Sequence, residues 1–122
     1  MTSPHLVHEI QIEQLRESLE QYMWVTSDRE RKMIRRILRE WGEIANAIDT
    51  ALINHRYRLL TFVITVDREA LFIEFVRDKN TKEWIYKSFR LGERGGWPYK
   101  WEYRVGEGLV ERTIKVKEVP RL

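Results

Sequence analysis

The chain has 122 residues, of which 43% are hydrophobic and 34% charged, which predicts one globular domain spanning residues 1–122. No apolar run approaches the roughly 18 residues of a membrane span, and no signal-peptide pattern is present, so we expect a cytoplasmic protein without a membrane partner. The lack of cysteine excludes disulfides, thiol nucleophiles and thiolate metal sites, while a net charge of +3 permits an anionic partner.

The N-terminal eight residues are predicted to be a loose tail, because they show no periodic pattern. Within this tail, His5 and His8 are expected to be solvated rather than a metal-binding pair, since no carboxylate cluster accompanies them. Apolar residues then recur at spacings of three and four between Glu9 and Trp24, which predicts an amphipathic helix with an acidic outer face.

A second helix is predicted to begin at a capping box formed by Ser27 and Glu30 and to run to about Asn54, with Gly42 as a point where it can bend. The first half of this helix is strongly basic. We expect a solvated face that pairs with the acidic first helix, and the alternative is a contact with nucleic acid or another domain. The cations are Arg29, Arg31, Lys32, Arg35, Arg36 and Arg39.

Beyond Arg56 the hydrophobic period changes from that of a helix to that of a strand. Strands are predicted at residues 57–66, 70–77, 82–91, 97–104 and 109–119, with short connections between them. Because short connections favour antiparallel neighbours, the predicted fold is α+β, with two N-terminal helices packed on a five-stranded antiparallel meander sheet.

The segment from Trp97 to Arg104 alternates an aromatic residue with proline or a charged residue, so a strand there presents four rings on one side. This aromatic wall is core, a partner interface or a platform for flat ligands. The loop at residues 92–96 leaves open whether Trp84 and Tyr86, or Ile85 and Phe89, join the wall, and we favour the first pair. The turns predict that Val66 lies opposite Ala70, Arg77 opposite Lys82, Val105 opposite Leu109, Glu102 opposite Arg112, Tyr99 opposite Lys115 and Trp97 opposite Lys117.

Catalytic motifs are missing from the sequence. Glu74, between apolar neighbours in a strand, and His55 are the candidate acid–base residues. The glycine-rich loop 92–96 is a candidate phosphate cradle, but it precedes a strand rather than a helix, and we favour a plain hairpin loop. We therefore expect no enzyme activity and no cofactor or metal.

Aromatic and basic residues are interleaved between residues 82 and 104, a combination that binds single strands by stacking on bases and contacting phosphates. The first hypothesis is a sequence-tolerant single-stranded DNA- or RNA-binding protein, aided by the basic start of the second helix. One alternative is an NTF2-like cone with a small-ligand pocket, and another is an assembly subunit whose aromatic face is a homodimer interface. The predicted nucleic-acid-binding residues are Trp84, Tyr86, Arg90, Arg94, Trp97, Tyr99, Lys100, Trp101, Tyr103, Arg104, Lys115 and Lys117.

The order of elements, the texture of Trp97–Arg104, the lack of cysteine and a charge-dense composition typical of thermophiles resemble the ThermoDBP single-strand DNA-binding proteins of archaea. The resemblance covers roughly residues 9–119 and rests on architecture rather than on a diagnostic motif. It implies binding of single strands in an apolar cleft flanked by basic residues, without an OB fold. Full-length ThermoDBP proteins carry a further C-terminal helical zipper, so the resemblance is to the short relatives.

Overall fold

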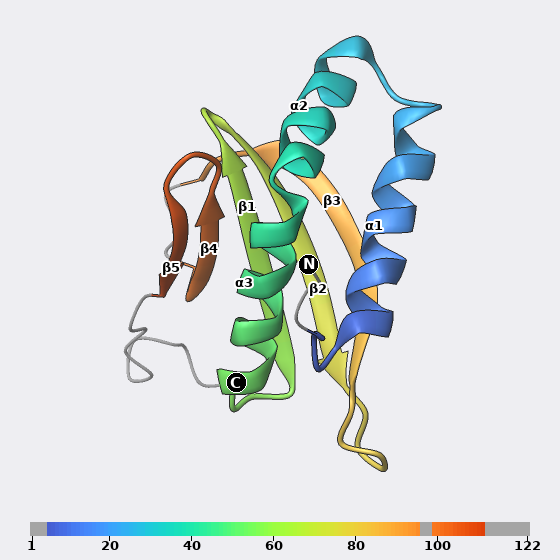
Figure 1. Cartoon of the computed structure of the whole chain (residues 1–122), viewed down its shortest axis with the longest axis vertical. Helices are drawn as coiled ribbons and strands as arrows, with labels where there is room; N and C mark the ends of the chain where they lie inside the picture. Colours follow the sequence, from blue (N-terminus) through green and yellow to red (C-terminus); the bar gives the residue numbers. More distant parts are fainter. Residues whose placement is uncertain (1–4, 96–98, 112–122) are drawn as a thin grey trace.

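The computed structural model describes residues 5–95 and 99–111, and it shows three helices on one face of a five-stranded sheet (Figure 1). The α+β class is confirmed, whereas the prediction of two helices is wrong. The helices are α1 (Glu9–Met23), α2 (Asp28–Arg39) and α3 (Trp41–Asn54). The strands are β1 (Leu59–Val66), β2 (Glu69–Arg77), β3 (Trp84–Glu93), β4 (Trp101–Arg104) and β5 (Gly108–Glu111).

The predicted long second helix consists of α2 and α3, which meet at Glu40 rather than at Gly42. Glu40 leaves helical geometry, with φ −106° and ψ 22°, and its N–H donates to the Ile37 carbonyl at 3.1 Å. Its carboxylate accepts the hydroxyl of Tyr103, a residue of β4, at 2.9 Å. The break therefore coincides with a long-range contact that the local sequence does not reveal. In the described ranges no helix is long and apolar enough to cross a membrane.

The described part of the N-terminal tail is anchored to α3. Asp49, which is 7% exposed, accepts the backbone N–H groups of Val7 and His8 at 3.0 and 2.8 Å and also contacts His8 Nδ1 at 3.0 Å. The prediction of a loose tail with a solvated His8 is therefore wrong for Val7 and His8, whereas the side chain of His5 is exposed, as expected. The predicted cap of α2 is confirmed, because Ser27 Oγ accepts the Glu30 N–H at 3.3 Å.

The sheet has the strand order β3-β2-β1-β4-β5. The pairs β1–β2, β2–β3 and β4–β5 are antiparallel, as predicted, but β4 runs parallel to β1. The meander prediction is therefore wrong: the chain leaves β3 on one side of the sheet and re-enters it beyond β1 (Figure 1). This crossover makes the sheet mixed and places the aromatic strand β4 beside β1 instead of beside β3.

The observed register between β1 and β2 differs by one residue from the predicted one. Each side chain of β1 therefore points to the opposite face of the sheet from the face that the predicted register implies. The β1–β2 turn contains two residues, and Asp67 adopts φ 56°, a left-handed conformation that aspartate tolerates. Val66 consequently pairs with Glu69, and not with Ala70 as predicted. The residues of β1 and β2 that share the helix-covered face are Leu60, Phe62, Ile64, Leu71, Ile73 and Phe75.

The β2–β3 pairing contains a bulge at Glu74/Phe75. On β3 the bulge falls between Tyr86, which pairs with Phe75, and Ser88, which pairs with Glu74. Trp84 and Tyr86 lie before the bulge and Phe89 lies after it, and all three side chains pack on the helix-covered core. The prediction that Trp84 and Tyr86 share a face with the rings of the aromatic strand is therefore confirmed, but the bulge places Phe89 on the same face as well. Arg77 lies opposite Trp84 rather than Lys82.

The β4–β5 register differs from the prediction by two residues, because the three-residue turn consists of residues 105–107 and begins one position earlier than the predicted pair of Val105 and Leu109 requires. Tyr103, rather than Val105, lies opposite Leu109, and Glu102 lies opposite Val110 rather than Arg112. The predicted pairs of Tyr99 with Lys115 and of Trp97 with Lys117 involve residues outside the described ranges.

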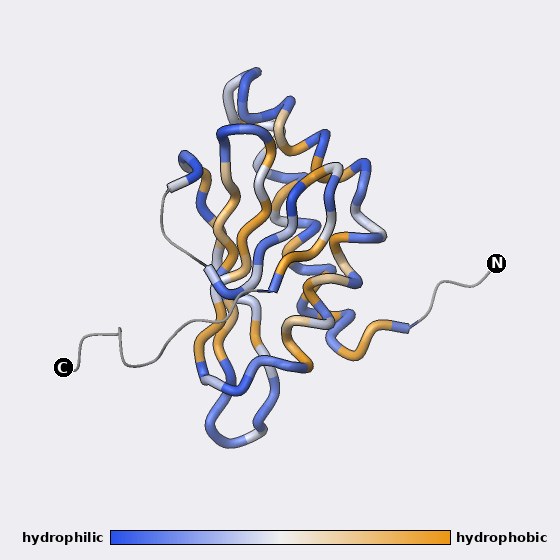
Figure 2. Tube along the Cα trace, turned by 90° about the vertical axis from the view of Figure 1, so that its left-hand side faces the viewer, coloured by the Kyte–Doolittle hydropathy of each residue, from blue (hydrophilic) through white to orange (hydrophobic). Residues whose placement is uncertain are grey.

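The sheet thus has two unlike faces. The helix-covered face forms the main core with the apolar sides of α1, α2 and α3, and Figure 2 shows apolar segments of helices and strands meeting there, while the β2–β3 hairpin is hydrophilic. The opposite side, which we call the open face, has a smaller cluster of Val63, Ala70 and Phe72, against which Tyr99 packs. Because Tyr99 immediately precedes the turn into β4, the end of the crossover lies over the open face.

Candidate nucleic-acid interface

The predicted aromatic wall is mostly core. Trp84 is 3% exposed, and Trp101 and Tyr103 are each 2% exposed, on the face that the helices cover. The Trp84 indole N–H donates to the Leu52 carbonyl of α3 at 2.9 Å, which fixes the ring against a helix. Tyr86 packs on the same core and is partly buried. The prediction of base stacking is therefore wrong in this fold for Trp84, Trp101 and Tyr103, whose rings are buried against the helices, while Tyr86 is only partly buried.

His55 is a structural residue of this core. It is 8% exposed, its Nδ1 accepts the Trp101 indole N–H at 3.1 Å, and its Nε2 lies 2.9 Å from the Leu59 carbonyl. These partners require the neutral tautomer with the proton on Nε2, which donates to the carbonyl. Burial lowers the pKa of His55, and the nearby charges of Lys100 and Arg77 lower it further. Both ring nitrogens are thus occupied, which leaves neither for general-base chemistry.

Glu74, the other acid–base candidate, lies on the opposite side of the sheet. It belongs to the open face, and its Oε1 is 3.3 Å from the Lys87 ammonium. The sheet therefore separates Glu74 from His55. It also separates Glu74 from Trp84 and Tyr86, although the pocket of an NTF2-like cone would need all three side chains on one face. Among the described residues no group of three or more His, Asp or Glu side chains could hold a metal ion.

The open face contains a compact cluster in which the Tyr99 ring and the Arg90 guanidinium both contact the ring of Phe72 of β2. The Arg90 Cζ lies 4.1 Å from the Phe72 ring centre, and the Tyr99 ring contacts the same residue at 5.4 Å with an interplanar angle of 56°. Gly92 borders this arrangement, and a Cβ there would be in ordinary van der Waals contact, 3.4 Å from Phe72 Cε2 and 3.7 Å from Arg90 Nη1. A pocket of about 160 Å³ adjoins the cluster, and its lining residues are Thr61, Phe72, Ile73, Glu74, Ser88, Phe89, Arg90 and Tyr99.

A buried carboxylate organises the cations beside this cluster. Glu102, 3% exposed, accepts the Thr65 hydroxyl at 2.9 Å and the Arg104 Nε–H at 2.8 Å, and Arg94 Nη2 lies 3.9 Å away. The hydrogen bond to Glu102 raises the pKa of Arg104, so that side chain stays cationic. Arg90 is exposed and has no carboxylate within salt-bridge distance in the described chain, which makes it the most available cation of this face.

The twelve predicted residues therefore separate into groups. The open face brings together Arg90, Arg94, Tyr99 and Arg104, whereas Lys100 lies immediately before β4, with its ammonium 5.7 Å from the Trp101 ring centre. Trp97, Lys115 and Lys117 lie outside the described residues. Sequence reasoning missed Phe72, because β2 is apolar on both faces and its alternation gives no signal for which ring faces outward.

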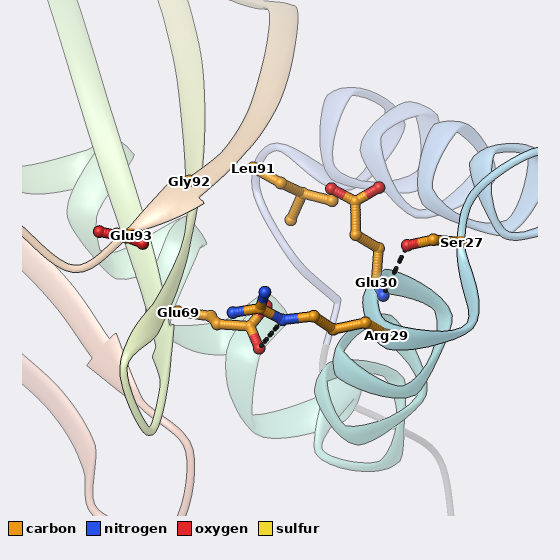
Figure 3. A pocket seen from close by; sticks show the side chains of 7 residues that line it. All are labelled: Ser27, Arg29, Glu30, Glu69, Leu91, Gly92 and Glu93. Carbon is orange, nitrogen blue, oxygen red and sulfur yellow. Dashed lines mark hydrogen bonds and ion pairs between the residues drawn. The ribbon is translucent and has the colours of Figure 1, made fainter.

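Gly92, the first residue of the glycine-rich loop, is poorly placed to hold a phosphate. Gly92 lines a pocket of about 260 Å³ between the start of α2 and the end of β3 (Figure 3). Three carboxylates, those of Glu30, Glu69 and Glu93, also line this pocket, and Arg29 Nε pairs with Glu69 at 3.2 Å. A phosphate there would meet more negative than positive charge, which disfavours this pocket as a phosphate site.

Comparison of the chain with protein-family models, with curated proteins and with solved structures found no significant match. The likeness to ThermoDBP proteins therefore stays a prediction from the sequence, and the functional argument rests on the geometry of the two faces of the sheet.

Proposed function

We propose that the chain binds single-stranded DNA or RNA across the open face with little dependence on sequence. The observation that carries this proposal is the cluster of Arg90, Phe72 and Tyr99 on the side of the sheet that α1, α2 and α3 leave uncovered. Tyr99 is partly exposed and offers a ring for stacking, and Arg90 can reach a phosphate from its position over Phe72. The hydroxyl groups of Thr61 and Ser88 line the adjoining pocket and can donate to or accept from any base.

The electrostatics of the open face support the same proposal. Arg94 and Arg104 share one carboxylate, that of Glu102, and Arg104 has a second partner in Glu107 at 3.4 Å. Arg90 adds a charge that has no such partner among the described residues. A single strand of nucleic acid that follows the two rings would therefore pass two partly neutralised arginines, Arg94 and Arg104, and then Arg90, which has no carboxylate partner among the described residues. Such a surface gives moderate, salt-dependent affinity.

The test is the binding of fluorescently labelled oligothymidine, followed by anisotropy at two salt concentrations. We expect affinity to fall as salt rises, with a log–log slope of about −0.7 for each phosphate contacted. Tyr99→Leu removes a stacking ring and should weaken binding about 5- to 150-fold, the equivalent of about 1–3 kcal/mol. Arg90→Gln should weaken binding and flatten the salt slope, whereas Lys79→Gln, the same charge loss in the β2–β3 hairpin, should do neither. Absence of salt-sensitive binding at micromolar protein would refute the proposal.

Self-association is a second candidate use of the open face. Leu59, Val76 and Ile85 lie side by side across β1, β2 and β3 on this face, and Leu59 and Ile85 are 52% and 39% exposed. A second copy could bury this apolar row against its own. Sedimentation at increasing protein concentration tests this candidate, and Ile85→Lys should abolish any dimer that depends on the row.

A further inference from the structure

We propose that a bound strand does not end at the open face but continues around the β1–β2 turn onto the outward side of α2, where Trp24 stacks on a base. This inference rests on the proposed function and lengthens its binding site. The surface concerned, which we call the α2 surface, consists of Trp24, Lys32, Arg35 and Arg39. Figure 1 shows α2, the β1–β2 turn and the end of β3 at the same end of the molecule.

The charge of the molecule is concentrated on α2. This helix has six cationic and two acidic side chains, so its formal charge of +4 exceeds the +3 of the whole chain, and the remainder is slightly acidic. A polyanion is attracted most strongly to the surface where such an excess is exposed. The charge distribution therefore directs a phosphate backbone toward α2.

The expected pairing of α2 with the acidic helix α1 is wrong. In α1 the carboxylates of Glu13 and Glu20 pair with Arg16 of the same helix. The arginines of α2 that have ion pairs use other partners, as Arg31 pairs with Asp28 at 2.5 Å. For the exposed side chains of Lys32, Arg35 and Arg39, no carboxylate lies within salt-bridge distance among the described residues. Their spacing of three and four residues places these three cations on one face of the helix.

Trp24 supplies the ring that the buried tryptophans of the sheet cannot. It is 86% exposed, and the neighbouring Val25 is 81% exposed, in the turn that leads into α2. Arg31 holds this turn, because its Nε donates to the Met23 carbonyl at 2.8 Å and its Nη2 to the Thr26 carbonyl at 2.9 Å. Arg31 thus ties the turn to the N-terminal end of the basic helix, and an exposed ring together with the cations of α2 is the combination that single-strand binding uses.

The β1–β2 turn lies between the two surfaces. Its carboxylates are neutralised from α2: Arg36 pairs with Asp67 at 2.9 Å, and Arg29 with Glu69 at 3.2 Å. Arg68 between them is exposed, and its carbonyl accepts the Arg94 N–H at 2.8 Å. The turn is therefore bonded to the end of β3, close to the arginines of the open face. A nucleic-acid strand that passes from there over Arg68 to the α2 surface meets the ion-paired Asp67 and the cationic Arg68, whereas the neighbouring pocket lined by Glu30, Glu69 and Glu93 repels it.

The test compares a short labelled oligothymidine of about 5 nucleotides with a long one of about 16, a range that single-domain sites span. The α2 variant has Lys32→Gln, Arg35→Gln and Arg39→Gln. A control of equal charge loss has Arg56→Gln, Lys79→Gln and Lys82→Gln, all at exposed positions elsewhere. Circular dichroism and urea unfolding establish that each variant is folded.

We expect the α2 variant to bind the long strand at least tenfold more weakly, with a salt slope shallower by about 2, and to bind the short strand like wild type. Trp24→Ala should likewise weaken only the long strand, and the control variant should match wild type with both.

Equal weakening of both lengths, or equal effects of the α2 variant and the control, would overturn the inference. If Arg90→Gln weakens both lengths while the α2 variant weakens neither, the proposed function stands and its extension fails. If no oligonucleotide binds, both fail. Binding of wild type to anionic phospholipid vesicles, lost in Trp24→Ala, without any effect of strand length, would assign the α2 surface to a membrane and overturn the inference.

Discussion

Acidification is expected to destabilise the fold through His55. Burial, followed by the charges of Lys100 and Arg77, lowers the pKa of this histidine in the folded chain below its ordinary value. The unfolded chain therefore binds more protons between the folded pKa and about 6.5. Stability contributed by neutral His55 is complete above about pH 6.5 and is lost as pH falls from there to the folded pKa, by at most about 1.4 kcal/mol per pH unit.

The structural reason is that a protonated ring cannot accept the Trp101 indole N–H at Nδ1. Urea unfolding of wild type and of His55→Gln between about pH 8 and pH 5 measures the effect, since glutamine does not titrate and both proteins retain His5 and His8. The wild type should lose more stability on acidification than the variant. A pH dependence of unfolding that is the same in the two proteins would refute the assignment to His55.

Two further predictions concern the anchoring of helix ends. Asp49→Ala should lower the free energy of unfolding by about 2–4 kcal/mol, because the N–H groups of Val7 and His8 lose their acceptor. Chemical denaturation of this variant and of Asp49→Asn measures the loss in free energy of unfolding. Ser27→Ala should cost about 1 kcal/mol through loss of the α2 cap, and Ser27→Asp should restore it; equal stability of Ser27→Ala and wild type would contradict the capping role of its bond to Glu30.

Local patterns were sufficient to predict most of the secondary structure. Helical spacing and the Ser27 capping box located α1 and the start of α2, and the short turns located the three antiparallel pairs. The break at Glu40 could not be predicted, because its partner Tyr103 is distant in sequence. The place of β4 beside β1 could not be predicted either, since a crossover is a long-range choice that connection length does not determine.

The candidate site was predictable in chemistry but not in position. Alternation correctly put Trp101 and Tyr103 on one side of a strand, yet whether that side is core or surface depended on the strand beside it. Trp24 read as the last residue of an amphipathic helix, and nothing in its neighbours showed that its ring would be 86% exposed. Aromatic content alone therefore did not distinguish a ring that packs in the core from one that is available for stacking.

Both candidate uses of the open face require the same surface, which makes them mutually exclusive. A second copy placed on Leu59, Val76 and Ile85 would lie directly beside the pocket that Arg90 and Tyr99 line. If both processes occur, mass action requires that oligothymidine dissociates the dimer and that high protein concentration weakens strand binding. Sedimentation with and without the long oligonucleotide measures this linkage. A dimer that binds the strand without dissociating would show that self-association uses another surface, and Ile85→Lys would then leave the dimer intact.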